Sequence, residues 1–161
     1  MPFVTKTTRR EWLTLAVAGV VAGRSASVAG ATLPVAQNDH AIEIWKTPTC
    51  GCCRLWVDHM RANGFRPTVH DVSDVSPIKR KFGVPASLES CHTGIVSGYA
   101  VEGHVPADVV RQMLKQRPQI AGLAVAGMPM GSPGMEQGSR KDPYNVVAFE
   151  RNGRTTVFAK R

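Results

Sequence analysis

Residues 47–53 read Thr-Pro-Thr-Cys-Gly-Cys-Cys and hold three of the four cysteines in the chain. The apolar run 41–45 before them has the composition of a strand, and residues 54–63 after them have the pattern of a helix. A thiol at the start of a helix faces free N–H groups and the positive end of the helix dipole, which favours its thiolate form. Because thiolates attack disulfides and bind soft metals, the stretch predicts redox or metal chemistry.

Cys50 and Cys53 form a Cys-x-x-Cys pair, the arrangement that thioredoxin-like proteins use for thiol–disulfide exchange. Cys52 is a further thiol at the same predicted helix end, and a simple dithiol–disulfide cycle does not need it. The additional sulfur therefore favours metal binding at this position, beside any redox chemistry of the pair.

The elements predicted along the chain follow the order of a thioredoxin-like α/β fold, a mixed sheet flanked by helices. They are a strand at 41–46, a helix at 54–63, a strand at 67–72, a helix at 76–82, a hairpin at 94–101 and a helix at 106–118. We assign residues 41–118 to this thioredoxin-like core. The helix after the cysteines places Met60 on its apolar face and His59 on the opposite, surface face.

A second chemical motif, Ser90-Cys91-His92-Thr93, lies in the loop that enters the predicted hairpin. In a thioredoxin-like arrangement this loop packs against the end of the helix that carries the Cys-x-x-Cys pair. We therefore expect Cys91 and His92 to lie beside Cys50 and Cys53. His104 precedes the helix at 106–118, and we interpret it as a surface or capping residue.

Residues 119–161 add a segment that this plan does not require, and we interpret them as a metal-binding extension. Met128, Met130 and Met135 lie on a loop rich in glycine and proline, which offers methionine few apolar contacts. Thioether sulfur is a soft ligand suited to Cu(I). The alternative is a small cluster of methionines packed beneath their own loop. Asn152-Gly153 predicts a closing hairpin that extends the sheet or holds the loop in place.

Residues 1–31 have the features of an export signal, and 32–40 those of a flexible leader. The segment 8–14, with Arg9 and Arg10, resembles the twin-arginine motif, and cleavage is expected near residues 29–31. The apolar run that follows the arginines is too short to form a stable membrane anchor. A periplasmic location follows from either a twin-arginine or an ordinary secretion signal.

The chain carries a formal net charge of +8 at pH 7, which raises the question of nucleic-acid binding. Its lysines and arginines are scattered, however, and no stripe interleaves them with aromatic side chains. Aromatic residues make up only 6% of the chain, too few for a base-stacking platform. Composition therefore argues against nucleic acid as a partner. Separately, we expect the protein to be a monomer.

Four motifs in order resemble the CopG-like periplasmic copper-resistance proteins, the Cys-x-Cys-Cys thioredoxin-like metal-binding family. They are Thr-Pro-Thr-Cys-Gly-Cys-Cys (47–53), Ser-Cys-His-Thr (90–93), Gly-His-Val-Pro-Ala (103–107) and Gly-Met-Pro-Met-Gly-Ser-Pro-Gly-Met-Glu (127–136). The resemblance spans residues 41–160. It implies a thiolate-bridged cluster of several copper ions and interconversion of Cu(I) and Cu(II) during copper detoxification, which would make the protein a copper oxidoreductase. Copper ions and periplasmic copper-efflux components are the implied partners.

The same resemblance implies a set of metal ligands drawn from three segments. Those that it assigns are Cys50, Cys52, Cys53, Cys91, His92, Met128 and Met135, with Met130 as a further candidate.

Two other interpretations remain open on the residues alone. A plain periplasmic thiol–disulfide oxidoreductase would use Cys50 and Cys53, with Cys50 as the attacking thiolate. It leaves Cys52, Cys91 and the loop methionines without a role. A structural zinc site would use Cys50, Cys53, Cys91 and His92, a common zinc ligand set, and would also ignore the methionines.

Overall fold

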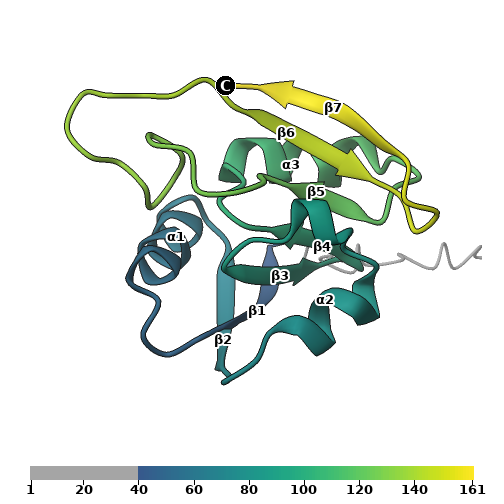
Figure 1. Cartoon of the computed structure of the whole chain (residues 1–161), viewed down its shortest axis with the longest axis horizontal. Coiled ribbons are helices and arrows are strands. Elements are labelled where there is room, and N and C mark those ends of the chain that lie inside the picture. Colours follow the sequence, from purple (N-terminus) through teal and green to yellow (C-terminus); the bar gives the residue numbers. More distant parts are fainter. Residues whose placement is uncertain (1–39) are drawn as a thin grey trace, which may run out of the picture. The chain divides into compact units, whose positions relative to one another are not determined.

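Residues 40–161, which the computed structural model describes, contain one mixed sheet with strand order β2-β1-β3-β4-β5-β6-β7 (Figure 1). Its strands are β1 (Ala41–Lys46), β2 (Arg66–Asp71), β3 (His92–Val96), β4 (Tyr99–Glu102), β5 (Gly122–Ala124), β6 (Asn145–Phe149) and β7 (Thr155–Lys160). The helices are α1 (Gly51–Ala62), α2 (Ser76–Phe82) and α3 (Ala107–Gln116), with a short 3-10 helix, η1 (Ala86–Leu88). The predicted thioredoxin-like α/β fold is confirmed.

The sheet combines two parallel strand pairings with four antiparallel ones. β1 pairs in parallel with β2 and antiparallel with β3, and β3 forms a tight antiparallel hairpin with β4. β5 then pairs in parallel with β4, and β6 and β7 continue the sheet as the closing hairpin. The sequence predicts this hairpin but not β5, whose three residues are too few to show a strand period.

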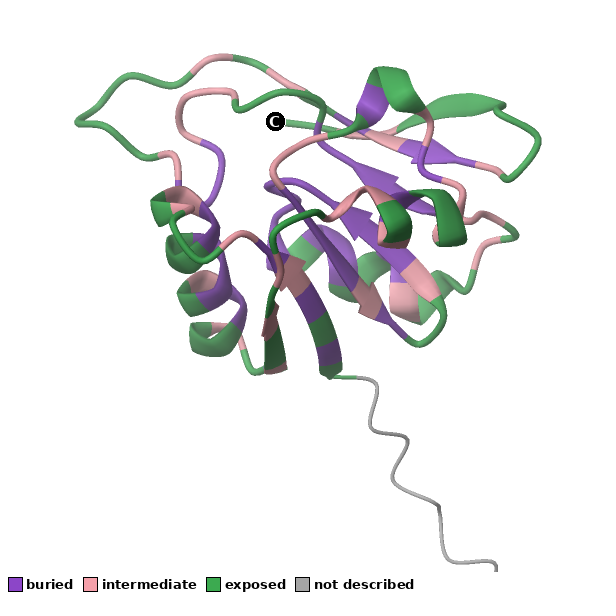
Figure 2. Cartoon of the chain, turned by 60° about the horizontal axis from the view of Figure 1, so that its bottom comes forward, coloured by how far each residue is buried: buried purple, intermediate pink, exposed green. Residues whose placement is uncertain are grey.

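The sheet is covered by helices on both faces, and successive strand residues point to alternate faces. α1 and α3 pack on one face, where Trp56, Met60 and Met113 join Val101 and Leu123 in the larger core cluster. The opposite face holds a smaller cluster that lies against α2 and η1. Its members include Ala100, Ala124, Phe149, Val84 and Leu88. Figure 2 shows buried residues along the central strands and along the inner side of α1.

The first turn of α1 contains the cysteine motif itself, which corrects the predicted helix start at residue 54. Cys50 is the N-cap residue, and its sulfur accepts a hydrogen bond from the backbone N–H of Cys53 at 3.4 Å. Cys53, Trp56, Val57 and Met60 form the buried stripe at the spacing that the sequence predicts. The indole N–H of Trp56 donates to the carbonyl oxygen of Val105 at 2.9 Å and fixes α1 beside the segment before α3.

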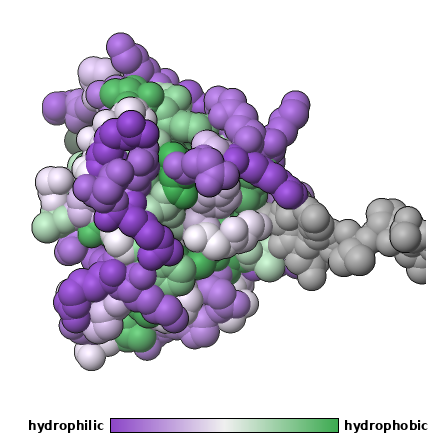
Figure 3. Space-filling view, turned by 90° about the vertical axis from the view of Figure 1, so that its right-hand side faces the viewer, coloured by the Kyte–Doolittle hydropathy of each residue, from purple (hydrophilic) through white to green (hydrophobic). Residues whose placement is uncertain are grey.

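The predicted export signal at 1–31, and the leader at 32–40 up to residue 39, lie outside the described residues. Among residues 40–161, no helix has the length and apolar character needed to cross a bilayer. On the face drawn in Figure 3, polar side chains surround small and separate apolar patches.

Candidate metal centre

Four cysteine sulfurs converge where α1 begins. The Sγ atoms of Cys50, Cys52, Cys53 and Cys91 all lie within 4.8 Å of one another. Cys50 and Cys53 are joined by a disulfide, whereas Cys52 and Cys91 are free thiols. The sulfurs of Cys50 and Cys52 are 3.5 Å apart. The structure thus places the second cysteine motif beside the first, as the thioredoxin-like arrangement predicts.

Local structure explains how three cysteines so close in sequence point to one place. Cys50 is extended and caps the helix, while Cys52 and Cys53 occupy the first turn. Cys53 is fully buried, and its sulfur lies 3.7 Å from the carbonyl oxygen of Cys91. Cys50 and Cys52 remain partly exposed at the helix end. One face of the cluster is therefore closed by the core, and the other can be reached from outside.

Cys91 also belongs to a second group of donors. Its Sγ lies 3.3 Å from Nδ1 of His92 and 3.3 Å from Nε2 of His104. The donor atoms of these three residues all lie within 4.8 Å of one another. Both histidines are fully buried, and their rings meet edge to face with centroids 5.1 Å apart. The Cys91 sulfur is thus shared between a group of four cysteine sulfurs and a group with two imidazoles.

The interpretation of His104 as a surface or capping residue is wrong. Its Nδ1–H donates to the carbonyl oxygen of Pro133 at 2.8 Å, which leaves a lone pair on Nε2 directed toward the sulfur of Cys91. The signal for this position was present in the sequence. The hairpin turns at Ser97-Gly98, so counting outward from the turn places residue 104 opposite residue 91.

Burial sets the charge states of this second group in the metal-free protein. Burial, and next the neighbouring Cys52 sulfur, raise the pKa of the Cys91 thiol to about 11. Burial lowers the pKa of His104, and lowers that of His92 well below its ordinary value, so both rings stay neutral near pH 7. Nε2 of His92 has no hydrogen-bond partner within residues 40–161. A bound cation would displace the thiol proton and use neutral imidazoles without further proton loss.

The methionine loop is attached to the cluster by its backbone at two points. The Ser90 hydroxyl donates to the carbonyl oxygen of Gly127 at 3.0 Å, immediately before Met128. Gly134 lies directly on the first turn of α1, with a φ of +86°. A Cβ atom there would come within 2.8 Å of the carbonyl oxygen of Cys52. Figure 1 shows the loop between β5 and β6 passing beside α1.

The three loop methionines differ in their surroundings. Met135 follows Gly134 directly and is half-buried, whereas 54% of Met128 is exposed. Met130 lies between them, also half-buried, and its carbonyl oxygen accepts a hydrogen bond from the backbone N–H of Asp142 at 2.9 Å. The backbone beside Met128 and Met135 therefore adjoins the thiols, while Met130 is anchored to the return segment of the loop.

A buried ion pair supports the loop that carries Cys91. Lys79 on α2 pairs with Glu102 at the end of β4, and both side chains are almost completely buried. The Glu102 carboxylate also accepts hydrogen bonds from the Thr93 hydroxyl at 2.7 Å and the Ser90 backbone N–H at 2.5 Å. Because every polar group in this network is paired, it holds the segment on both sides of Cys91 in one position.

His59 and His70 lie outside the cluster. His59 was predicted on the surface, and this is wrong: it is half-buried, and its Nε2 accepts a hydrogen bond from the Ala107 backbone N–H at 3.1 Å. His70 pairs with Glu43 on the neighbouring strand and stacks on Trp45 with ring centroids 4.8 Å apart. Neither ring belongs to a donor group with the cysteines.

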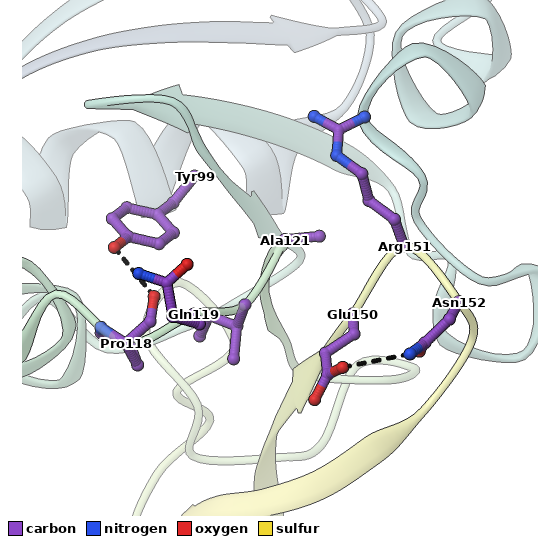
Figure 4. A pocket seen from close by; sticks show the side chains of 8 residues that line it. Tyr99, Pro118, Gln119, Ala121, Glu150, Arg151 and Asn152 are labelled. Atoms are coloured by element: carbon purple, nitrogen blue, oxygen red, sulfur yellow. Dashed lines mark hydrogen bonds between the residues drawn. The ribbon is translucent and has the colours of Figure 1, made fainter.

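A surface pocket of about 440 Å³ lies at the far end of β4 from the thiols (Figure 4). It is lined by Tyr99, Pro118 to Ala121 and Glu150 to Asn152. Two of its polar side chains are already hydrogen-bonded: the Tyr99 hydroxyl donates to the carbonyl oxygen of Pro118, and the Glu150 carboxylate accepts from Asn152 and Arg154. The pocket contains none of the predicted site residues.

Two solved structures resemble this chain over most of its length. They are titled "Copper resistance protein copG", Form 2 and Form 1, and each shares 47% sequence identity with the chain at a TM-score of 0.72. Each alignment covers 75% of this chain and 97% or 96% of the other. The chain belongs to the CopG family.

A family model described as a protein of unknown function, DUF411, matches residues 88–135 of this CopG-family chain. The matched segment contains Cys91, His92, His104 and all three loop methionines. No match is found among curated proteins.

Proposed function

We propose that this CopG-family protein binds copper at the convergent cysteines in the service of copper resistance, and that the site holds more than one copper ion. The observation that carries this proposal is the shared position of Cys91. Its sulfur faces three other cysteine sulfurs on one side and two imidazole nitrogens on the other. Because a thiolate can bridge two metal ions, this sulfur is placed to join two neighbouring coppers.

The donor set fits copper better than it fits a single structural zinc. Sulfur and imidazole are ligands that copper accepts, and thiolates and thioethers select its Cu(I) state. A structural zinc takes four ligands in a closed tetrahedron. Here four cysteine sulfurs and two histidines converge, with the methionine loop attached at Gly127 and Gly134. The two imidazoles present Nδ1 of His92 and Nε2 of His104 to the Cys91 sulfur.

In the site we propose, the ligands are Cys50, Cys52, Cys53, Cys91, His92, His104, Met128 and Met135. Met130 is a weaker candidate, because its backbone is tied to Asp142 on the far side of the loop. Two thiolates become available only after the Cys50–Cys53 disulfide is reduced, so copper loading depends on the redox state of the pair.

The wider role that we propose follows the family resemblance. The protein would act in the periplasm after export through its N-terminal signal, and would interconvert Cu(I) and Cu(II) before copper leaves the cell by efflux components. Support comes from the soft donors, which favour Cu(I), beside imidazoles, which also suit Cu(II).

Copper titration of the fully reduced protein tests the proposal. Under anaerobic conditions, competition with a Cu(I) chelator should show more than one equivalent bound. Replacing Cys91 with Ser should remove the bridge between the two donor groups and lower the number of equivalents. Replacing Met113 with Leu, a change in the core of α3 away from the thiols, is the matched control for a sulfur that plays no part. Saturation at one equivalent in the parent protein would contradict the multinuclear site.

A second candidate function is thiol–disulfide exchange. The observation that favours it is the disulfide between Cys50 and Cys53 at the start of α1, where helix N–H groups stabilise a thiolate. Insulin reduction by the metal-free protein in the presence of dithiothreitol would measure this activity.

A further inference from the structure

We propose that the Cys50–Cys53 dithiol is the electron donor of the copper site: it reduces Cu(II) to Cu(I) and becomes the disulfide seen in the structure. The inference rests on the proposed copper function and adds the source of the electrons. It joins the two candidate functions, because thiol–disulfide chemistry would then be one half of the copper reaction.

The placement of the sulfurs supports different roles for the two pairs of cysteines in the cluster. Cys50 and Cys53 are already within bonding reach of each other across the first turn of α1. Cys52 and Cys91 remain free thiols when that bond has formed. The sulfur of Cys52 lies 3.5 Å from that of Cys50, so a copper ion held by Cys52 would be next to the reacting pair.

The donor groups that remain after the Cys50–Cys53 disulfide has formed are suited to hold the Cu(I) product. Once the disulfide has formed, the remaining thiols are Cys52 and Cys91, and the sulfur of Cys91 still faces His92 and His104. These groups, with the thioethers of the nearby loop, can hold Cu(I), while the loss of two thiolates weakens the total binding. Oxidation of the pair would therefore both produce Cu(I) and loosen it for transfer.

The electrons and atoms of the step balance without a further reactant. Two Cu(II) ions each accept one electron, the Cys50 and Cys53 thiols each release a proton, and one S–S bond forms. The products are two Cu(I) ions, one disulfide and two protons. Return to the dithiol needs a reducing thiol or dithiol, which would attack Cys50, because Cys50 is partly exposed and Cys53 is completely buried.

The test adds Cu(II) without oxygen to the reduced and desalted protein. We expect about two Cu(II) ions per chain to lose their electron paramagnetic resonance signal, as a two-electron couple requires. After the copper is removed with a chelator in denaturant, alkylation should count two free thiols in place of the four that the sequence supplies. Peptide mapping should place the disulfide between Cys50 and Cys53.

Replacing Cys53 with Ser removes the internal partner of Cys50, and we expect the rapid loss of the Cu(II) signal to disappear. Far-ultraviolet circular dichroism shows whether this variant is folded. If the variant is unfolded, the peptide mapping of the disulfide in the parent protein still tests the inference. The inference is overturned if four thiols remain after Cu(II) is added. It is equally overturned if the disulfide joins Cys52 to Cys91, or if it joins two chains on a non-reducing gel.

Direct Cu(I) titration of the same reduced protein separates this inference from the proposed function. If Cu(I) binds at more than one equivalent while Cu(II) leaves all four thiols intact, the copper site stands and the dithiol is not its electron donor. If Cu(I) does not bind, the proposed function itself fails.

Discussion

Cys91 and His104 show at the level of single residues how the fold assembles a donor group. They approach each other because β3 and β4 pair antiparallel around a two-residue turn, and the register continued outward from the strands places Cys91, just before β3, opposite His104, two residues after β4. The carbonyl oxygen of Pro133 then fixes the imidazole with Nε2 toward the sulfur. A remote loop thus sets the tautomer of this candidate ligand, as the outer partners of metal-bound histidines commonly do.

Replacing His104 with Ala should weaken Cu(I) binding by at least about tenfold, the lower end of what the loss of a supporting partner costs a metal site. The reason is that the substitution removes one of the two imidazoles that face Cys91. Competition against a Cu(I) chelator measures the change. Replacing His70 with Ala is the matched control, since His70 lies outside the donor groups and contacts Glu43. Equal affinities for the two variants would exclude His104 as a ligand.

The sequence predicted the cysteines of the cluster more successfully than its histidines. Cys50, Cys52 and Cys53 are adjacent in sequence, so a helix start is enough to bring them together. Cys91 followed from the thioredoxin-like plan. His104 was missed because its position follows only from counting the β3–β4 register outward from the turn, and its orientation from the hydrogen bond that its Nδ1–H donates to the carbonyl oxygen of Pro133. Whether each residue binds copper stays a prediction.

At the level of elements, α1 and α3 are joined by a titratable contact. The Ala107 backbone N–H, one of the free donors at the start of α3, donates to Nε2 of His59 near the end of α1. Only a neutral imidazole can accept this bond. Burial lowers the pKa of His59, while the nearby Glu136 and Asp108 carboxylates act to raise it, and burial prevails.

We therefore expect the metal-free protein to lose stability as the pH falls below about 6.5, the ordinary histidine value. The pKa of His59 is lower in the folded chain than in the unfolded chain, so the unfolded chain takes up the proton first and the free energy of unfolding falls. Burial lowers the pKa values of His92 and His104 in the same direction. Urea unfolding at about pH 5.5 and 7.5 measures the change.

Replacing His59 with Gln separates the contribution of His59 to the acid sensitivity of stability from the contributions of His92 and His104. The glutamine amide oxygen can accept the Ala107 hydrogen bond, but it does not titrate in this range. The variant should show a shallower dependence of stability on pH than the parent protein. Identical slopes for the two proteins would mean that the His59 contact contributes nothing to the acid sensitivity.

Helices and strands were predicted well where a repeating apolar pattern or a turn motif in the sequence defines them. The stripe on α1 and the Asn152-Gly153 hairpin carry such signals, and both are present. β5 carries none, because residues 122–124 are all buried and three residues are too few to show a period. These residues form a strand only because they pair with β4 and β6, and the sequence of the segment alone does not predict such long-range pairing.

At the level of the whole molecule, residues 119–161 continue the sheet of the thioredoxin-like core. β5 pairs with β4, and β6 and β7 follow it, so the segment that carries the methionine loop also covers an edge of the core. Leu123 and Val146 belong to the larger core cluster, and Phe149 to the smaller one. The predicted methionine ligands and several core side chains are therefore supplied by the same part of the chain.

We expect a chain that ends at residue 118 to lose cooperative folding. Truncation removes the fully buried Leu123, Val146 and Phe149 and exposes the edge of β4. Each of these side chains contributes roughly 1.5–3 kcal/mol through burial. Their combined loss, on the order of 5–9 kcal/mol by the same rule, equals most of the 5–15 kcal/mol by which a typical domain is stable. Circular dichroism during urea unfolding would show a broad, low-midpoint transition or none.

The matched control keeps the whole fold but shortens the methionine loop, with residues 128–130 replaced by a Gly-Ser link. Its backbone attachments at Gly127 and Gly134 remain, so it should unfold cooperatively, as the full-length chain should, while binding less copper. A cooperative transition near the full-length midpoint in the chain that ends at 118 would contradict this reasoning. Residues 119–161 would then be a detachable metal-binding appendage, and the sheet would have to tolerate an open edge at β4.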